Sequence, residues 1–249
     1  MLTVSGLTVN AEDPMTQTLE IGYWKVQITP GDFDDATIVG FSEKGESEKN
    51  TVNAAITIPS TVTSTKKYKG TYTVTAIGPG AFKEDKFTSV TMTGNVKTIG
   101  NNAFMDCPNL RVATLRGKLQ VIEYDAFKRC AKLRQADLGS YVTQIGAQAF
   151  RDCTTLTSVG IPSDGNKITR LGNYCFSGCN KLESFNFGAA LTTNAKIEEY
   201  AFSLDTSLQY VDLSVLGEGA SVGSNAFVGC SGIQGIDVSN MFAEQIDES

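Results

Sequence analysis

The side chains that most enzymes use for acid–base or nucleophilic chemistry are scarce in this chain. Its 249 residues contain no histidine, which removes Ser-His-Asp and Cys-His nucleophile systems and any histidine metal site. No P-loop, GxGxxG or CxxC motif occurs. The carboxylates Glu198 and Glu199 lie in an ordinary polar stretch, whereas a glycosidase needs two carboxylates that face each other across a cleft. The sequence therefore predicts no catalytic residue, no cofactor and no enzyme.

Cysteine is the remaining reactive residue type, and five of the six cysteines recur at one spacing. Each of the five follows a phenylalanine by three residues: Cys107, Cys130, Cys153, Cys179 and Cys230. Asp85 and Asp205 occupy the same place in two other repeats. A free thiol is small and readily buried, so the spacing favours a packed structural ladder over a reactive site. Cysteines in neighbouring repeats would also come close enough for a cross-repeat disulfide, and this alternative stays open.

Phenylalanine sets the period of the chain. Seven phenylalanines recur at spacings of 22, 23, 23, 26, 26 and 25 residues, and all but one follow an alanine: Phe82, Phe104, Phe127, Phe150, Phe176, Phe202 and Phe227. A period in the twenties is typical of a solenoid, in which no single coil can bury its apolar face alone. Stacking the coils would bury a continuous row of phenylalanine rings.

Each repeat combines two hydrophobic patterns. The run Ala-Phe-x-x-Cys-x-x-Leu advances in steps of three residues, which predicts a single helical or 3₁₀ turn. Apolar residues then alternate, as in Ala113 and Leu115, which predicts a strand that pairs in parallel with the strands of neighbouring coils. An aliphatic residue such as Ile99 stands five places before each phenylalanine and is often followed by glycine, which suits a tight turn.

The repeat is seen almost whole in Ile145–Pro162, IGAQAFRDCTTLTSVGIP. It resembles the BspA-type leucine-rich repeat, and the resemblance covers about Ile56–Val238. The resemblance implies an α/β repeat solenoid: a right-handed leucine-rich-repeat stack with parallel strands on one face and short helical turns that carry the Ala-Phe anchors. It also implies a bacterial surface or secreted protein that binds host or matrix proteins.

The chain divides into three predicted regions. Residues 53–238 are expected to form the solenoid. Residues 1–52 are expected to hold a leader segment and a capping β-hairpin, because residues 24–28 alternate between apolar and polar before the turn Pro30-Gly31-Asp32. Such a cap covers the open core and strand edge of a first coil. Residues 239–249 are expected to form a tail or a partial cap.

Charge and hydropathy limit the partners and the location. The net charge of −6 disfavours nucleic acid or an anionic membrane as a partner. No stretch is long and apolar enough to insert into a bilayer, and the N-terminus lacks the pattern of a secretory leader. A mature secreted protein and a cytosolic protein both stay open at this point. The family resemblance favours a secreted or cell-surface protein whose leader lies outside this sequence.

The outward side chains of the predicted strands form the candidate binding surface, which we call the strand face. Its residues are Thr114, Gln135, Asp137, Asn186, Tyr210, Asp212 and Asp237. Three interpretations stay open: a solvated polar surface, a docking site for a basic protein, and a weak Ca²⁺ site built on two neighbouring aspartates. The coil insertions Ser163–Lys167, Gly188–Lys196 and Ser214–Ala220 and the basic tip Lys66–Lys69 are further contact candidates.

These observations favour a non-catalytic, surface-exposed or secreted binding module that adheres to a host or matrix protein or glycan through the strand face and the coil insertions. A first alternative is a structural segment of a longer cell-envelope repeat array. A second alternative is a cytosolic protein-interaction scaffold. The sequence names no ligand for any of the three.

Overall fold

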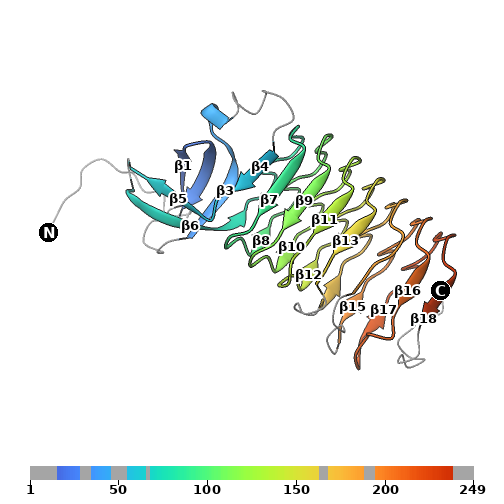
Figure 1. Cartoon of the computed structure of the whole chain (residues 1–249). Helices are drawn as coiled ribbons and strands as arrows, with labels where there is room; N and C mark the ends of the chain where they lie inside the picture. The colour runs from blue at the N-terminus through green and yellow to red at the C-terminus, as the bar shows by residue number, and fades with distance from the viewer. Residues whose placement is uncertain are drawn as a thin grey trace.

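The chain forms a parallel β-solenoid. The computed structural model describes residues 16–28, 35–45, 55–65, 68–162, 168–187 and 194–237. Figure 1 shows the coils stacked side by side along one axis, with the N-terminal strands at one end and β16, β17 and β18 at the other. The predicted coil insertion at residues 163–167, most of that at 188–196, and the C-terminal tail at 239–249 lie outside the described residues.

One ladder of short parallel strands runs the whole length of the stack. It begins at β6 (Gly70–Ile77) and continues in register through β8 (Thr98–Ile99), β10 (Val121–Ile122), β12 (Gln144–Ile145), β14 (Arg170–Leu171), β15 (Lys196–Ile197) and β17 (Ser221–Val222). Each of these short strands ends on the aliphatic residue five places before a phenylalanine, and that residue is buried. A lone aliphatic residue carries no alternation, so the sequence did not predict this ladder.

A second ladder carries the predicted strand face. It contains β4 (Ala55–Ile58), β7 (Ser89–Met92), β9 (Val112–Leu115), β11 (Gln135–Asp137) and β13 (Ser158–Gly160). The strands β16 (Tyr210–Asp212) and β18 (Gly235–Asp237) form a separate parallel pair. Ser184 is joined to Tyr210 by a single bridge, so the strand face is interrupted between β13 and β16. The inward residues predicted from the alternation, such as Ala113 and Leu115, are buried.

The predicted helical turns around the phenylalanines are consecutive β-turns instead. In the coil of Phe150, Gln148 and Asp152 have φ values of 57° and 59°, and the Ala149 N–H donates to the Gly146 carbonyl at 3.2 Å. A positive φ at the third position defines a type II turn and interrupts any right-handed helix. Among the described residues, helical conformation is confined to residues 43–45. The solenoid is therefore a β-structure and not the α/β structure expected.

Hydrogen bonds between coils explain why turns replace helices here. The Phe104 N–H donates to the Ala126 carbonyl and the Phe127 N–H to the Ala149 carbonyl, both at 2.7 Å. Alternate N–H groups of each turn region are thus satisfied by the next coil, whereas a helix would satisfy them within one coil. A three-residue step in the sequence fits both a helix and a series of turns. The carbonyl group that decides between them, by accepting the N–H of the turn, lies more than twenty residues away in the sequence.

The turn conformation predicts a stabilising substitution at Leu204. Leu204 is 58% exposed and has a φ of 65°, while Gly178 and Gly229 occupy the same place in the adjacent coils. We expect Leu204→Gly to raise the free energy of unfolding by about 0.5–1 kcal/mol. A left-handed conformation costs a non-glycine residue about 1–2 kcal/mol, and glycine avoids this cost. The gain is smaller than the full cost because glycine loses more conformational entropy on folding than leucine does. Thermal unfolding measures the change. Val228→Gly, a similarly exposed control without a positive φ, should destabilise, and a loss in both variants would contradict the turn assignment.

The phenylalanine rings form one stacked row through the core. Consecutive rings from Phe82 to Phe227 have centroids 4.9–5.4 Å apart and planes within 19° of parallel. Six of the seven rings are completely buried, and Phe227 in the last described coil is partly buried. Ring stacking and burial therefore reinforce each other along the axis of the solenoid.

The repeated cysteines form a ladder of buried free thiols beside this row. Each thiol donates to the carbonyl of the phenylalanine in the preceding coil, as Cys130 does to Phe104 at 3.1 Å and Cys230 to Phe202 at 2.9 Å. Burial raises the pKa of Cys230 to about 11 and raises that of Cys153 further. The thiols stay protonated at neutral pH, so they serve as hydrogen-bond donors and not as nucleophiles.

Asp205 interrupts the cysteine ladder with a carboxyl group. Its side chain is 0% exposed, and its Oδ1 accepts the Cys179 N–H at 2.7 Å, while Oδ2 has no hydrogen-bond partner among the described residues. Burial raises the pKa of Asp205 to about 8. This coil therefore holds a polar group at the position where five other coils hold a small, hydrogen-bonded thiol.

The N-terminal region contains one strand more than the predicted hairpin. The strands β1 (Gln17–Ile21), β2 (Trp24–Ile28) and β3 (Asp35–Phe41) pair antiparallel in that order. β3 then pairs in parallel with β6, while β5 (Thr61–Ser64) pairs antiparallel with the first half of β6. The additional strand, β1, is separated from β2 by a turn at Gly22, whose φ is 61°.

The last described coil covers its core only in part. Ile236 stands at the same repeat position as the inward residue Ala113, but it is 43% exposed. Neither β17 nor β18 has a further strand partner among the described residues. The core is thus less enclosed here than in the middle coils, because a solenoid coil is buried only by neighbours on both sides.

Candidate ligand-binding face

The predicted strand-face residues fall into two groups on the structure. Thr114 and Gln135 lie on β9 and β11 with Asp137, and the parallel register places Asp137 directly beside Thr114. Tyr210 and the aspartates Asp212 and Asp237 lie on β16 and β18 at the far end of the stack. Asn186 lies between the groups, in the coil that interrupts the ladder. The seven residues share a face of the solenoid without forming one cluster.

The first group is engaged in contacts within the protein. The Asp137 carboxylate accepts a hydrogen bond from Arg116 Nε at 2.7 Å, forms an ion pair with Arg116 Nη2 at 2.6 Å, and accepts a second hydrogen bond from the Gly139 N–H at 3.3 Å. Arg116 is 65% exposed, so this ion pair contributes only about 0.2–1 kcal/mol to stability. The pair nevertheless neutralises the carboxylate locally. Sequence reasoning missed Arg116, which follows the preceding strand and reaches across one coil.

Tyr210 and Asp212 of the second group border a hollow that we call the Tyr210 cleft. The cleft has a volume of about 260 Å³ and is lined by Ser184, Phe185, Asn186, Phe187, Tyr210, Asp212 and Val215. Phe185 and Phe187 are buried, whereas Ser184 and Asn186 are exposed. The hollow includes Ser184, the residue at which the ladder is interrupted between β13 and β16. The cleft itself was not predicted, because the alternation of the sequence is regular through this coil.

Hydrogen bonds hold the polar groups of the Tyr210 cleft in place. Asp212 Oδ1 accepts the Ser214 N–H at 3.0 Å and also the Ser214 hydroxyl. The Tyr210 hydroxyl lies 3.5 Å from Asp237 Oδ2, to which it donates. Partial desolvation and the carboxylates of Asp237 and Asp212 raise the pKa of Tyr210, so its phenol stays protonated at neutral pH.

The arrangement differs from a metal site. Within the described residues, no three cysteine, aspartate or glutamate side chains gather closely enough to hold an ion. Asp212 and Asp237 stand in register on neighbouring strands, but two carboxylates fall well short of the six to eight oxygen ligands that Ca²⁺ takes. What the cleft offers is an aromatic ring, an amide, a hydroxyl and an oriented carboxylate.

Comparison with known proteins identifies the repeat. The family model for the BspA type leucine rich repeat region matches residues 75–203 and 169–249, in six copies. The chain belongs to the BspA-type leucine-rich repeat family. No curated protein matches the chain at a significant level.

Solved structures similar to this BspA-type repeat chain come from several bacteria. The leucine-rich repeat protein of T. pallidum (TpLRR) superimposes with a TM-score of 0.63 at 23% identity, covering 85% of this chain and 88% of its own. The pneumococcal vaccine antigen PcpA gives 0.60 at 16% identity, covering 91% and 71%. A leucine-rich repeat protein of Bacteroides ovatus gives 0.51 at 21% identity, covering 88% and 70%. At these identities the likeness concerns the fold alone.

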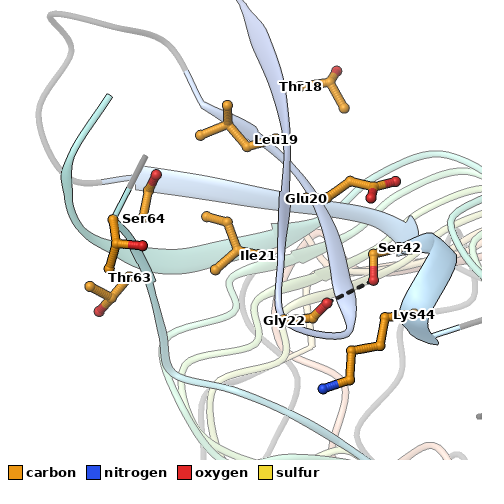
Figure 2. A pocket seen from close by; sticks show the side chains of 10 residues that line it. Thr18, Leu19, Glu20, Ile21, Gly22, Ser42, Lys44, Thr63 and Ser64 are labelled. Atoms are coloured by element: carbon orange, nitrogen blue, oxygen red, sulfur yellow. Dashed lines mark hydrogen bonds between the residues drawn. The ribbon is translucent and has the colours of Figure 1, made fainter. Parts of the chain in front are cut away.

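A second hollow of the BspA-type chain lies at the opposite end, between β1 and β5. This N-terminal groove has a volume of about 560 Å³. Figure 2 shows Leu19 and Ile21 of β1 pointing to the side on which Thr63 lies, and the Ser42 hydroxyl bonded to the Gly22 carbonyl at 2.7 Å. No predicted site residue lines the groove. In the described part of the chain, no helix is long and apolar enough to span a bilayer.

Proposed function

We propose that this chain is a non-catalytic binding module of a bacterial surface or secreted protein, and that it holds a protein or glycan ligand at its C-terminal strand face. The observation that carries the proposal is the gathering of Asn186, Tyr210 and Asp212 around one cleft, with Asp237 beside it. Elsewhere on the same face Asp137 is already paired with Arg116. Ligand sites usually combine aromatic and apolar walls with a few oriented polar groups, and the lining of this cleft has both kinds of side chain.

Family and scaffold support the same proposal. Leucine-rich repeats are commonly a protein-interaction fold, and the stacked core holds neighbouring strands in parallel register, so outward side chains keep fixed positions. The description of one structural neighbour as a pneumococcal vaccine antigen supports a location at the cell surface. Adhesion to a host or matrix component is the role we propose on this basis.

A three-residue variant tests the proposed binding face. We expect Tyr210→Ala combined with Asp212→Ala and Asp237→Ala to abolish saturable binding of the purified protein to its targets on an array of matrix proteins and glycans. All three side chains are at least partly exposed, so the core should be unaffected. The expected loss is more than about tenfold in affinity, which corresponds to more than about 1.4 kcal/mol of binding free energy. Truncation of a single central contact residue can cost that much, so three together should reach it.

The matched control for this variant lies on the other group of the strand face. Thr114→Ala combined with Gln135→Ala and Asp137→Ala removes an equal number of polar side chains from β9 and β11. This control should retain binding, and both variants should unfold at temperatures close to that of the parent. Binding that survives in the first variant and disappears in the control would move the site to the first group and refute the proposal.

The last described coil favours one alternative function, a structural segment of a repeat array. Ile236 is 43% exposed and Phe227 is only partly buried in this coil, and exposed apolar surface often marks an interface. End-to-end association of the purified protein in sedimentation experiments, without binding to any array component, would favour this alternative.

We also propose that β1–β3 close the N-terminal end of the core. Trp24 stacks on Phe41 with centroids 5.5 Å apart, and Phe41 lies 5.1 Å from Phe82, the first ring of the row. The aromatic row thus continues into the N-terminal strands. The division of the chain at residues 52 and 238 stays a prediction.

A further inference from the structure

The geometry of the Tyr210 cleft points to a specific class of ligand. We propose that the cleft binds a neutral saccharide, with one pyranose ring lying against the Tyr210 side chain and its hydroxyl groups bonded to Asn186 and Asp212. This inference rests on the binding function proposed above and names the ligand for the same site.

The size of the cleft favours a small ring over a protein surface. Ligand pockets for small molecules measure roughly 300–1,000 Å³, and the Tyr210 cleft, with about 260 Å³, lies just below the lower end of that range. A stable protein interface instead needs roughly 800 Å² of surface from each partner. A single sugar ring, with the rest of a glycan extending into solvent, matches the space available.

The Tyr210 ring offers the apolar surface that a sugar requires. The side chain is 52% exposed, although it lies on a strand whose next residue, Val211, is buried. Its neighbour in the next coil is Gly235, which has no side chain to cover the ring. A Cβ added at Gly235 would stand 3.7 Å from the Tyr210 Cδ2 atom, in contact with the ring. Pyranose rings carry C–H groups on their faces, and these pack on aromatic rings whose hydroxyl end stays hydrated.

The polar lining suits the hydroxyl groups at the edge of a sugar. Each sugar hydroxyl both donates and accepts a hydrogen bond. The Asn186 amide supplies both donor and acceptor atoms, the Asp212 carboxylate supplies acceptors only, and the Ser184 hydroxyl can do either. The Ser214 N–H donates to the Asp212 carboxylate at 3.0 Å and orients it before a ligand binds. Binding therefore loses less side-chain entropy at Asp212 than it would at a mobile carboxylate.

The charge of the site selects against acidic ligands. None of the seven described residues that line the cleft is basic, and Asp212 lines it with Asp237 in register on the next strand. A carboxylated, sulfated or phosphorylated sugar would bring a second negative charge beside these carboxylates without a counterion. The site is therefore expected to discriminate neutral from anionic saccharides.

Titration with defined sugars tests the inference. The full chain is titrated with neutral monosaccharides and disaccharides and with their uronic acid and sulfated counterparts, and binding is followed by saturation-transfer NMR and calorimetry. We expect saturable binding of at least one neutral sugar, loss of roughly tenfold or more in affinity in Tyr210→Ala, and a similar loss in Asp212→Asn. Tyr141→Ala, which removes a tyrosine that is 49% exposed and does not line the cleft, is the matched control and should bind as the parent does.

The outcomes separate this inference from the proposed function. Absence of neutral sugar binding, binding unaffected by Tyr210→Ala, or preference for the acidic sugars would each overturn the saccharide assignment. If the array experiment still shows a protein target that depends on Tyr210, the proposed binding face stands and only the ligand class is wrong. If neither experiment shows dependence on Tyr210, both proposals fail.

Discussion

Replacement of Asp205 by cysteine is expected to raise the free energy of unfolding by about 3–5 kcal/mol at neutral pH. The native pKa of Asp205 is raised by burial from 3.8 to about 8, and each pH unit between these values corresponds to 1.36 kcal/mol. For a chain of this length the midpoint of thermal unfolding should rise by roughly 10 °C. A cysteine here would continue the ladder that runs from Cys107 to Cys230.

The substitution leaves no donor without a partner. The Cys179 N–H, which Asp205 accepts, also donates to the Phe176 carbonyl at 3.0 Å. By the pattern of the other coils, the new thiol would donate to that same Phe176 carbonyl, as Cys230 does to Phe202. The variant therefore removes a buried carboxyl group and its unpartnered Oδ2 without creating a new unsatisfied group.

The pH dependence of stability gives the sharper measurement. Between about pH 4 and pH 8 the folded protein holds a proton on Asp205 that the unfolded chain has released, so stability falls as pH rises through this window and becomes level above it. Denaturant unfolding at a series of pH values should show this fall in the parent. It should be absent in Asp205→Cys and in the isosteric Asp205→Asn. A parent profile identical to those of the variants would refute the buried, protonated state.

Truncation of Phe127 to alanine is expected to cost about 3–5 kcal/mol, the range for an aromatic residue in a close-packed core. Its ring is 0% exposed and stacks between Phe104 at 4.9 Å and Phe150 at 5.1 Å. Both ring contacts are lost with the side chain, and the coils on either side limit how far the cavity can collapse. Urea unfolding followed by circular dichroism measures the difference.

Phe227→Ala is the matched comparison for this truncation. It removes the same side chain from the last described coil, where the ring is partly buried and has one stacking partner in the row, Phe202 at 5.3 Å. We expect it to cost less than half as much as Phe127→Ala. Equal losses in the two variants would indicate that residues beyond 237 enclose Phe227 as fully as the middle coils enclose Phe127.

The repeat and its core could be read from spacing alone, because the phenylalanine row, the cysteine ladder and the alternating strand residues each recur at fixed positions. The turns around Phe150 could not, since helices and successive turns share the three-residue step and the choice depends on hydrogen bonds to the next coil. The strands of the first ladder were missed for a related reason. Two residues such as Thr98–Ile99 form a strand only because the neighbouring coils pair with them.

The sequence predicted which strand residues face outward, but it did not predict which of them gather around a cleft. Alternation along the strands identified Tyr210 and Asp212 as outward residues. It could not show that Asp137 is paired with Arg116 or that the ladder is interrupted at Ser184. Both features arise from contacts between coils, which a pattern within one repeat does not contain.

Amide hydrogen exchange of the protein with and without its strongest array target tests the binding account most directly. The account predicts added protection at residues 184–187 and 210–214 and at Gly235–Asp237, the three segments that surround or adjoin the Tyr210 cleft. Exchange along the first ladder, from β8 to β17, should stay unchanged. Protection confined to the N-terminal groove of β1 and β5, or to the first ladder, would contradict the account and place the ligand on another face of the solenoid.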